Sequence, residues 1–125
     1  MVETIQTDNA PAAAGAYSQG RATDDLVFTA GQVARTPDGE SLRDADVATQ
    51  TEQVLENIAA VLEAGGADLD DVLKVTVFLR DIEDFDEMNE TYEAFFGEEL
   101  PARSAIEVGQ PPAGMALEIE AVAAR

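Results

Sequence analysis

Apolar residues recur at helical spacing in two segments of the chain. The first, Val47–Ala64, carries an apolar stripe close to the 3.6-residue period of an α-helix and is followed by the stop signal Gly65-Gly66. A second helix is predicted to begin near Phe85 and to end at Gly97. Its stripe consists of Phe85, Met88, Asn89, Tyr92, Phe95 and Phe96.

Shorter apolar runs predict strands. The clearest is Val72–Leu79, which is rich in Val, Leu and Phe, and further strands are expected at 26–30, from residue 33, at 102–108 and at 116–123. The segment 33–40 also holds the turn signal Thr36-Pro-Asp-Gly39, and the small-residue-rich segment 9–20 is expected to be a loop. The order strand, strand, helix, strand, helix, strand, strand predicts an α/β (α+β) fold, a single mixed β-sheet with two helices on one face.

The predicted strand Val72–Leu79 has apolar residues on both of its sides. Strict alternation puts Leu73, Val75, Val77 and Leu79 on one side and Val72, Thr76 and Phe78 on the other, where Lys74 is the only charge. Two helices cover only one face of a sheet, so the other face needs a different partner. The simplest partner is a second copy of the chain, which predicts a homo-oligomer with cyclic symmetry.

Length and composition narrow the class of protein. A chain of 125 residues with 46% apolar residues is expected to form one ordered domain, 1–125. We see no signal peptide and no membrane-spanning run, so a cytoplasmic protein with no membrane partner is expected. The 7 basic and 26 acidic residues give a net charge of 7 − 26 = −19, which repels phosphate backbones and disfavours nucleic acid as a partner. Such a charge fits a halophilic, high-salt cytosol and an ordinary acidic protein equally well.

Three residue types with rich chemistry are missing. The chain has no Cys, no His and no Trp. These absences exclude a Ser-His-Asp triad, a thiol nucleophile, a disulfide and imidazole or thiolate metal ligands. We expect no metal, and chemistry must come from Arg, carboxylates, Tyr, hydroxyls, amides and backbone groups.

Two charged residues are candidates for a site. Arg103 follows Pro101 at the entrance of a predicted strand, where a guanidinium can bind a carboxylate through two parallel hydrogen bonds. The alternative is an Arg that is solvated or paired with one of the acids. Glu118 shares one face of its strand with Glu120, and on a subunit-facing sheet it can polarise or deprotonate a bound water. The alternative is that both are solvated acids at the rim.

Two polar residues in unusual places are further candidates. Asn89 interrupts an apolar helix stripe and can orient a ligand or a loop through its amide, or it can be a buried Asn satisfied by backbone groups. Tyr17, in the small-residue loop, can lie over a planar ligand or can simply pack. The glycines of this loop form no phosphate-binding motif.

Six segments together resemble the reactive-intermediate deaminase family, RidA or YjgF, from Asn9 almost to the end of the chain. They are Asn9-Ala-Pro…Gly15-Ala-Tyr17-Ser-Gln-Gly20, Phe28-Thr-Ala-Gly31-Gln-Val, Lys74-Val-Thr-Val-Phe-Leu, Asn89-Glu-Thr-Tyr-Glu-Ala-Phe-Phe96, Pro101-Ala-Arg103-Ser and Glu118-Ile-Glu-Ala. The resemblance implies a chorismate-mutase-like fold and a homotrimer with a central β-barrel and three sites at the subunit clefts. It also implies hydrolysis of enamine and imine carboxylates, such as 2-aminoacrylate and 2-aminocrotonate, to 2-keto acids and ammonia without a cofactor.

The resemblance also implies a role for each matching residue. Arg103 corresponds to the family's anchor for the substrate carboxylate and Glu118 to its water-orienting carboxylate. The remaining candidates are substrate-binding: Tyr17 as an aromatic wall, Asn89 as the helix asparagine, Gly31 as a point of close approach, and Ala105 through its backbone carbonyl.

Three positions depart from the family pattern. Ala30 stands where Ser is frequent, Ala105 where Cys is frequent, and Ala16 where Pro is frequent. The first two bear on substrate range and rate. A non-catalytic, small-carboxylate-binding or regulatory trimer is the main alternative. A ribonuclease is disfavoured by the charge and the missing His, and the sequence neither supports nor excludes a chaperone role.

Overall fold

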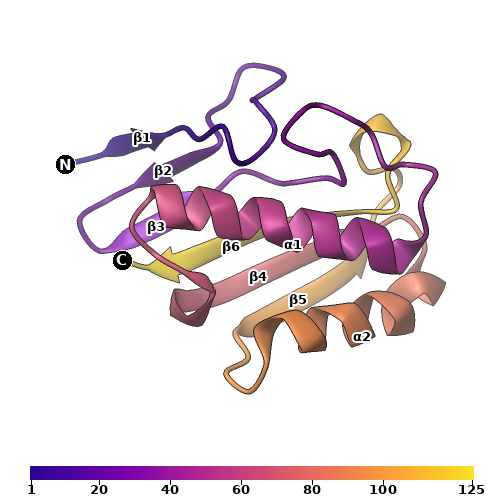
Figure 1. The fold of residues 1–125 in the computed structure, drawn as a ribbon. Coiled ribbons are helices and arrows are strands. Elements are labelled where there is room, and N and C mark those ends of the chain that lie inside the picture. Colours follow the sequence, from indigo (N-terminus) through magenta and orange to yellow (C-terminus); the bar gives the residue numbers. More distant parts are fainter.

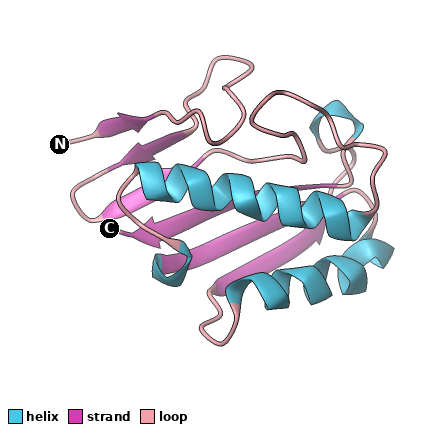
Figure 2. Ribbon diagram, in the orientation of Figure 1, coloured by secondary structure: helices cyan, strands magenta, loops and turns pink.

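A computed structural model describes residues 1–125, and its centre is one six-stranded sheet with two helices on the same face (Figures 1 and 2). The strands follow the order β1-β2-β3-β6-β4-β5; β4 and β5 are parallel and the other pairs antiparallel, so the sheet is mixed, as predicted. No helix has both the length and the apolar character needed to cross a membrane. The elements are β1 (Glu3–Ile5), β2 (Gly20–Ala22), β3 (Leu26–Thr29), α1 (Val47–Ala64), β4 (Val72–Leu79), α2 (Phe85–Phe96), β5 (Ala102–Glu107), β6 (Leu117–Ala124) and the 3-10 turns Leu69–Asp71, Ile82–Asp84 and Pro112–Gly114.

Helix α1 has the bounds that its apolar stripe predicts. The carboxylate of Asp46 caps its first turn by accepting a 2.8 Å hydrogen bond from the Thr49 amide. Gly65 ends the helix, and its missing side chain matters, since a β-carbon there would lie 2.6 Å from Ile5 Cδ1. The helix therefore stops where the chain passes tightly over β1 and β3.

The centre of the core lies between the helices and strands β4 and β6. Leu117, Ile119, Val77 and Leu79 are fully buried there. Residues of β6 alternate between this core and the opposite face, which puts Glu118 and Glu120 on the face that no helix covers. We call this the open face.

The predicted faces of β4 are wrong for its first two residues, Val72 and Leu73. A register irregularity between Val72 and Lys74 turns Val72 inward and leaves Leu73 half exposed, although strict alternation predicts the reverse. A bulge adds one residue to one strand and flips the side chains beyond it. Leu73 therefore adds to the exposed apolar area, which also includes Phe28 and Ile106.

The N-terminal half differs from prediction. Strands β1 and β2 were not expected, because three-residue strands that contain Glu3 and Arg21 carry too little apolar alternation to be seen. The segment 33–40 is not a strand of the sheet; it is an irregular excursion closed by a single bridge between Arg35 and Ser41. Its predicted turn is present, with Gly39 at φ 92°, a left-handed conformation that favours glycine.

Candidate functional site

A hollow of about 390 Å³ lies beside the Glu118 carboxylate. Strand β6 places Glu118 at this position by its alternation, and Pro112, the first residue of the 3-10 turn Pro112–Gly114, lines the hollow as well. The wall opposite the carboxylate is apolar. The lining residues are Ala14, Tyr17, Ala30, Gly31, Val33, Pro112 and Glu118.

Gly31 and Glu118 are held against each other by backbone pairing. The Gln32 amide donates to the Ile119 carbonyl at 2.8 Å, and the Ile119 amide donates back to the Gln32 carbonyl at 3.0 Å. In this antiparallel pairing Gly31 lies opposite Glu120, and Glu118 is the diagonal neighbour of Gly31 on the same face of the sheet. The space that a side chain at Gly31 would occupy is filled by the Glu118 carboxylate, so this glycine admits the acid itself and not only a ligand.

Burial raises the pKa of Glu118 above the ordinary value of a Glu side chain, and the neighbouring negative charge of Glu120 raises it further. A carboxylate with a raised pKa is a stronger base when it is ionised. Placed at the edge of a hollow, it can take a proton from a bound water and return it to a leaving group.

Tyr17, the predicted aromatic wall, is one of the residues that line the same hollow. Its ring is about half exposed, and its hydroxyl accepts a 3.1 Å hydrogen bond from the Ala14 amide. It is therefore fixed by its own loop rather than by packing into the core, in contrast to the alternative of an ordinary packing tyrosine.

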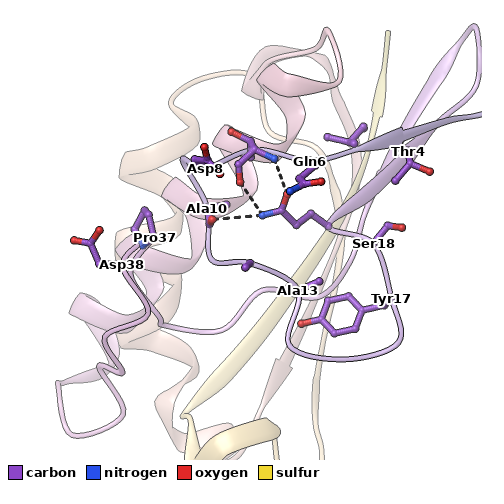
Figure 3. Close-up of a pocket in the computed structure, with 13 residues that line it drawn as sticks. Thr4, Gln6, Asp8, Ala10, Ala13, Tyr17, Ser18, Pro37 and Asp38 are labelled. Carbon is purple, nitrogen blue, oxygen red and sulfur yellow. Dashed lines mark hydrogen bonds between the residues drawn. The ribbon is translucent and has the colours of Figure 1, made fainter.

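The loop that carries Tyr17 is anchored by Gln19, a residue whose role the sequence did not reveal. Its buried amide donates to the carbonyls of Thr7 and Pro11, at 3.0 and 2.8 Å, and accepts from the Thr7 amide at 2.7 Å. The residues that make these bonds border the largest hollow in the chain, which has a volume of about 510 Å³. Figure 3 shows this hollow with Tyr17 on one side and Pro37 and Asp38 on the other. This hollow is lined by no basic side chain, so it offers no cationic group to an anionic substrate.

Arg103 lies elsewhere, on the helix side of β5. Its Nη1 donates to Oδ1 of Asn89 at 2.7 Å, and Asn89 in turn donates to Oε1 of Glu93 at 3.2 Å. The Glu93 contact fixes the amide so that its oxygen faces the guanidinium. Asn89 is thus satisfied by side chains, so the alternative of a buried Asn paired with backbone is wrong.

The charge of Arg103 has no counter-ion in the chain. Only two ion pairs are present, Met1–Asp24 and Arg125–Glu3, although the chain has 26 acidic residues. Arg103 borders a second hollow, of about 230 Å³, lined by Asn89, Tyr92, Glu93, Leu100, Pro101 and Arg103. A half-buried, unpaired guanidinium beside a hollow is suited to bind a carboxylate.

Ala105 lies two residues after Arg103 on β5, the last strand of the sheet. The Val108 amide bonds to the Leu79 carbonyl at 2.8 Å, which sets the alternation of this parallel pair. By that alternation Arg103, Ala105 and Glu107 turn their backbone amides and carbonyls to the free edge. The carbonyl of Ala105 is therefore available at the free edge of the sheet.

The predicted site residues form two groups that one chain does not bring together. Tyr17, Gly31 and Glu118 share the first hollow, whereas Arg103 and Asn89 share the second. Glu118 aligns with Phe78 across β4 and points to the open face, but Arg103 aligns with Val75 and points to the helices. No group of three or more acidic residues lies close enough together to hold a metal ion.

Comparison with known proteins gives consistent matches along the whole chain. Residues 7–125 match the family model described as Endoribonuclease L-PSP. A RutC family protein of Pyrococcus horikoshii is 49% identical over 98% of both chains. A protein of Escherichia coli K12 named 2-iminobutanoate/2-iminopropanoate deaminase is 45% identical over 100% of this chain and 99% of its own. Among solved structures, E. coli TdcF with bound serine superimposes with a TM-score of 0.93 at 42% identity, over 98% of both chains.

Proposed function

The chain belongs to the Endoribonuclease L-PSP family, also called the YjgF/RidA family, and on this premise we propose that it hydrolyses enamine and imine carboxylates to 2-keto acids and ammonia. The substrate class is that of the relative named 2-iminobutanoate/2-iminopropanoate deaminase. The observation that carries the proposal is that the half-buried guanidinium of Arg103 borders a hollow and is held there by the neutral amide of Asn89 rather than by a carboxylate. A guanidinium held in this way keeps its charge for a carboxylate supplied by the substrate.

We further propose that the working site forms between subunits of a homotrimer. Arg103 and Glu118 face opposite sides of one sheet, so they meet on one small substrate only if they come from two different chains. The open face, with the exposed Phe28, Leu73 and Ile106, is the surface that a second copy would cover. The sequence resemblance implies that the sheets of three subunits pack through this face into a central barrel.

In the proposed reaction Arg103 of one subunit binds the substrate carboxylate through the N–H groups that Asn89 leaves free. The bound enamine takes up a proton from solvent at its terminal carbon and becomes a protonated imine (an iminium), whose C2 carbon is electrophilic. Glu118 of the neighbouring subunit removes a proton from a water as its oxygen bonds to C2, and the C=N π electrons move to nitrogen.

The resulting carbinolamine then breaks down. Glu118 returns its proton to the nitrogen, the C–N bond breaks with its electron pair, and ammonia leaves. The hydroxyl proton is lost as the C=O double bond forms. The sum is imine plus water to 2-keto acid plus ammonia, so the reaction consumes no redox equivalent.

A second candidate function is binding of small carboxylates without turnover. The observation in its favour is the relative E. coli TdcF, whose structure holds serine. A binder needs the guanidinium of Arg103, but it gains nothing from burying the Glu118 carboxylate beside Gly31, where burial raises its pKa. We propose no nucleic acid partner, since the acidic surface opposes a phosphate backbone.

The test is a coupled assay. A threonine dehydratase is run with semicarbazide, which traps the imine, and semicarbazone is measured with the parent protein, Arg103→Ala and Arg43→Ala. Arg43 is exposed and its side chain makes no hydrogen bond, so its variant is a control for the lost charge. The proposal predicts that the parent and Arg43→Ala suppress the semicarbazone and that Arg103→Ala does not. If the parent does not suppress it, the deaminase proposal is contradicted and binding without turnover becomes the leading candidate.

A further inference from the structure

Two aromatic rings of α2 lie against the guanidinium of Arg103. Its Cζ is 5.3 Å from the centre of the Phe85 ring and 4.6 Å from that of the Tyr92 ring. Both distances lie within the range of a cation–π interaction. Phe85, Asn89 and Tyr92 are spaced i, i+4, i+7, so one face of α2 supplies both rings and the hydrogen-bonded amide between them.

This face of the helix holds Arg103 without neutralising it. The N–H groups of a guanidinium lie in its plane, whereas an aromatic ring attracts it through the ring face. Aromatic contacts therefore restrict the group while its donors stay available. A carboxylate at any of the three positions would occupy the donors and cancel the charge that the substrate needs.

The hydroxyl of Tyr92 shows that the ring, not the phenol, makes this contact. It is buried and has no hydrogen-bond partner, which is unfavourable for a polar group. Burial raises the pKa of Tyr92 to about 12, so the phenol stays neutral and supplies no negative charge to Arg103. Phe96 stacks on Tyr92 at 4.6 Å between ring centres but makes no contact of this kind with Arg103.

We propose that Phe85 and Tyr92 are positioning residues that hold the plane of the Arg103 guanidinium so that its free N–H groups face the substrate carboxylate. The inference rests on the proposed function and adds to it the residues that set substrate affinity. Their contribution is made before the substrate arrives, by reducing the rotamer freedom that binding must otherwise remove.

The test compares Phe85→Leu and Tyr92→Leu with the matched control Phe96→Leu. Phe96 is a buried aromatic residue of the same helix, so its variant reports the cost of losing a ring from this layer. The first two variants are expected to raise KM about tenfold with kcat changed by less than about threefold, and Phe96→Leu to leave KM within about twofold. Tyr92→Phe keeps the ring face, so its KM is expected to equal that of the parent and not the raised KM of Tyr92→Leu.

Binding of 2-oxobutanoate, measured by titration calorimetry, separates this inference from the proposed function. The parent is expected to bind it, and Phe85→Leu and Tyr92→Leu about tenfold more weakly. A parent that turns over the imine, together with leucine variants of unchanged KM and unchanged affinity, would overturn the positioning role and leave the function standing. A KM increase in Phe96→Leu equal to that in Tyr92→Leu would also overturn it. A parent without turnover and without binding would overturn both.

Discussion

A β-carbon placed on Gly31 would lie 2.5 Å from Oε1 of Glu118 and 2.6 Å from its Cδ. Real side-chain contacts do not reach such distances, so the Glu118 carboxylate lies where only glycine permits it. The close approach ties the half-buried Glu118 of the open face to a loop residue far away in the sequence. A substitution at Gly31 can therefore test the position of the carboxylate without removing the carboxylate.

Gly31→Ala is expected to lower kcat at least tenfold while the fold is kept. The new methyl group pushes away the far end of a flexible side chain, so the free energy of unfolding is expected to fall by less than about 1.5 kcal/mol. Coupled-assay rates and urea unfolding measure the two effects. Gly109→Ala is the control, because a β-carbon there meets nothing within 4 Å. Full activity in Gly31→Ala would show that the carboxylate position does not matter.

The raised pKa of Glu118 predicts an acid limb in the rate profile. Activity needs the ionised carboxylate, so kcat/KM is expected to fall as the pH drops through a midpoint above the ordinary Glu pKa. Burial and Glu120 both disfavour the ionised form, so this limb lies at higher pH than for an exposed acid. A profile that stays flat down to the ordinary Glu pKa would contradict a general-base role.

The same pKa shift has a consequence for stability with a definite sign. Between the ordinary pKa and the raised one the folded chain binds more protons than the unfolded chain, so stability falls as the pH rises through this window. Glu118→Gln removes this cost. Its Tm is expected to exceed that of the parent at pH 7, with the difference vanishing below the ordinary Glu pKa. An equal difference at both pH values would indicate another cause.

Asn89→Asp tests whether the free charge of Arg103 matters. The new carboxylate would sit at the 2.7 Å contact now made by Oδ1 and would pair with Arg103. We expect KM to rise at least tenfold, because the new carboxylate neutralises Arg103. Thermal stability is expected to change little, because the new ion pair is offset by the lost bond to Glu93 and by repulsion from that carboxylate. Asn89→Ala is the companion variant, which removes the contact without neutralising the charge, and a smaller rise in KM is expected. A KM unchanged by Asn89→Asp would show that Arg103 is not the anchor.

The acidic surface predicts a fold that salt stabilises. The chain has a net charge of −19 and only two ion pairs, so most carboxylates have no positive partner and their mutual repulsion opposes the folded state. Raising KCl from about 0.05 M to about 1 M shortens the Debye length to roughly 3 Å and is expected to raise Tm by at least about 5 °C. A plateau by that concentration indicates an ordinary acidic protein, and a continued rise indicates adaptation to high salt. A Tm independent of KCl would show that repulsion is unimportant.

The sequence predicted the elements whose signals are local. Both helices have their expected bounds, because a periodic stripe ends at Gly65 in one and at Gly97 in the other. Alternation alone put Glu118 on the open face. Strands β1 and β2 were missed because the pairing of β1 with β2 and of β2 with β3, and not their composition, makes them strands.

Other features depend on contacts between distant segments, which a single sequence does not show. The bulge near Val72 exists only relative to β6. Phe85 and Tyr92 belonged to the predicted apolar stripe, yet only the fold shows that this stripe ends against Arg103. In the same way, the separation of Arg103 from Glu118 follows from the registers of β5 and β6 on β4 and from nothing in either motif.

The proposed shared site is tested most directly by mixing two inactive variants. Arg103→Ala subunits keep Glu118, and Glu118→Gln subunits keep Arg103, so a site between two different variants can have both groups intact. Equal amounts are unfolded together, refolded and assayed, with each variant refolded alone as the control. A site shared between neighbours predicts recovery of about a quarter of the parent activity, because about one interface in four pairs the two intact groups. No recovery in mixed trimers would contradict a site built from Arg103 of one subunit and Glu118 of the next.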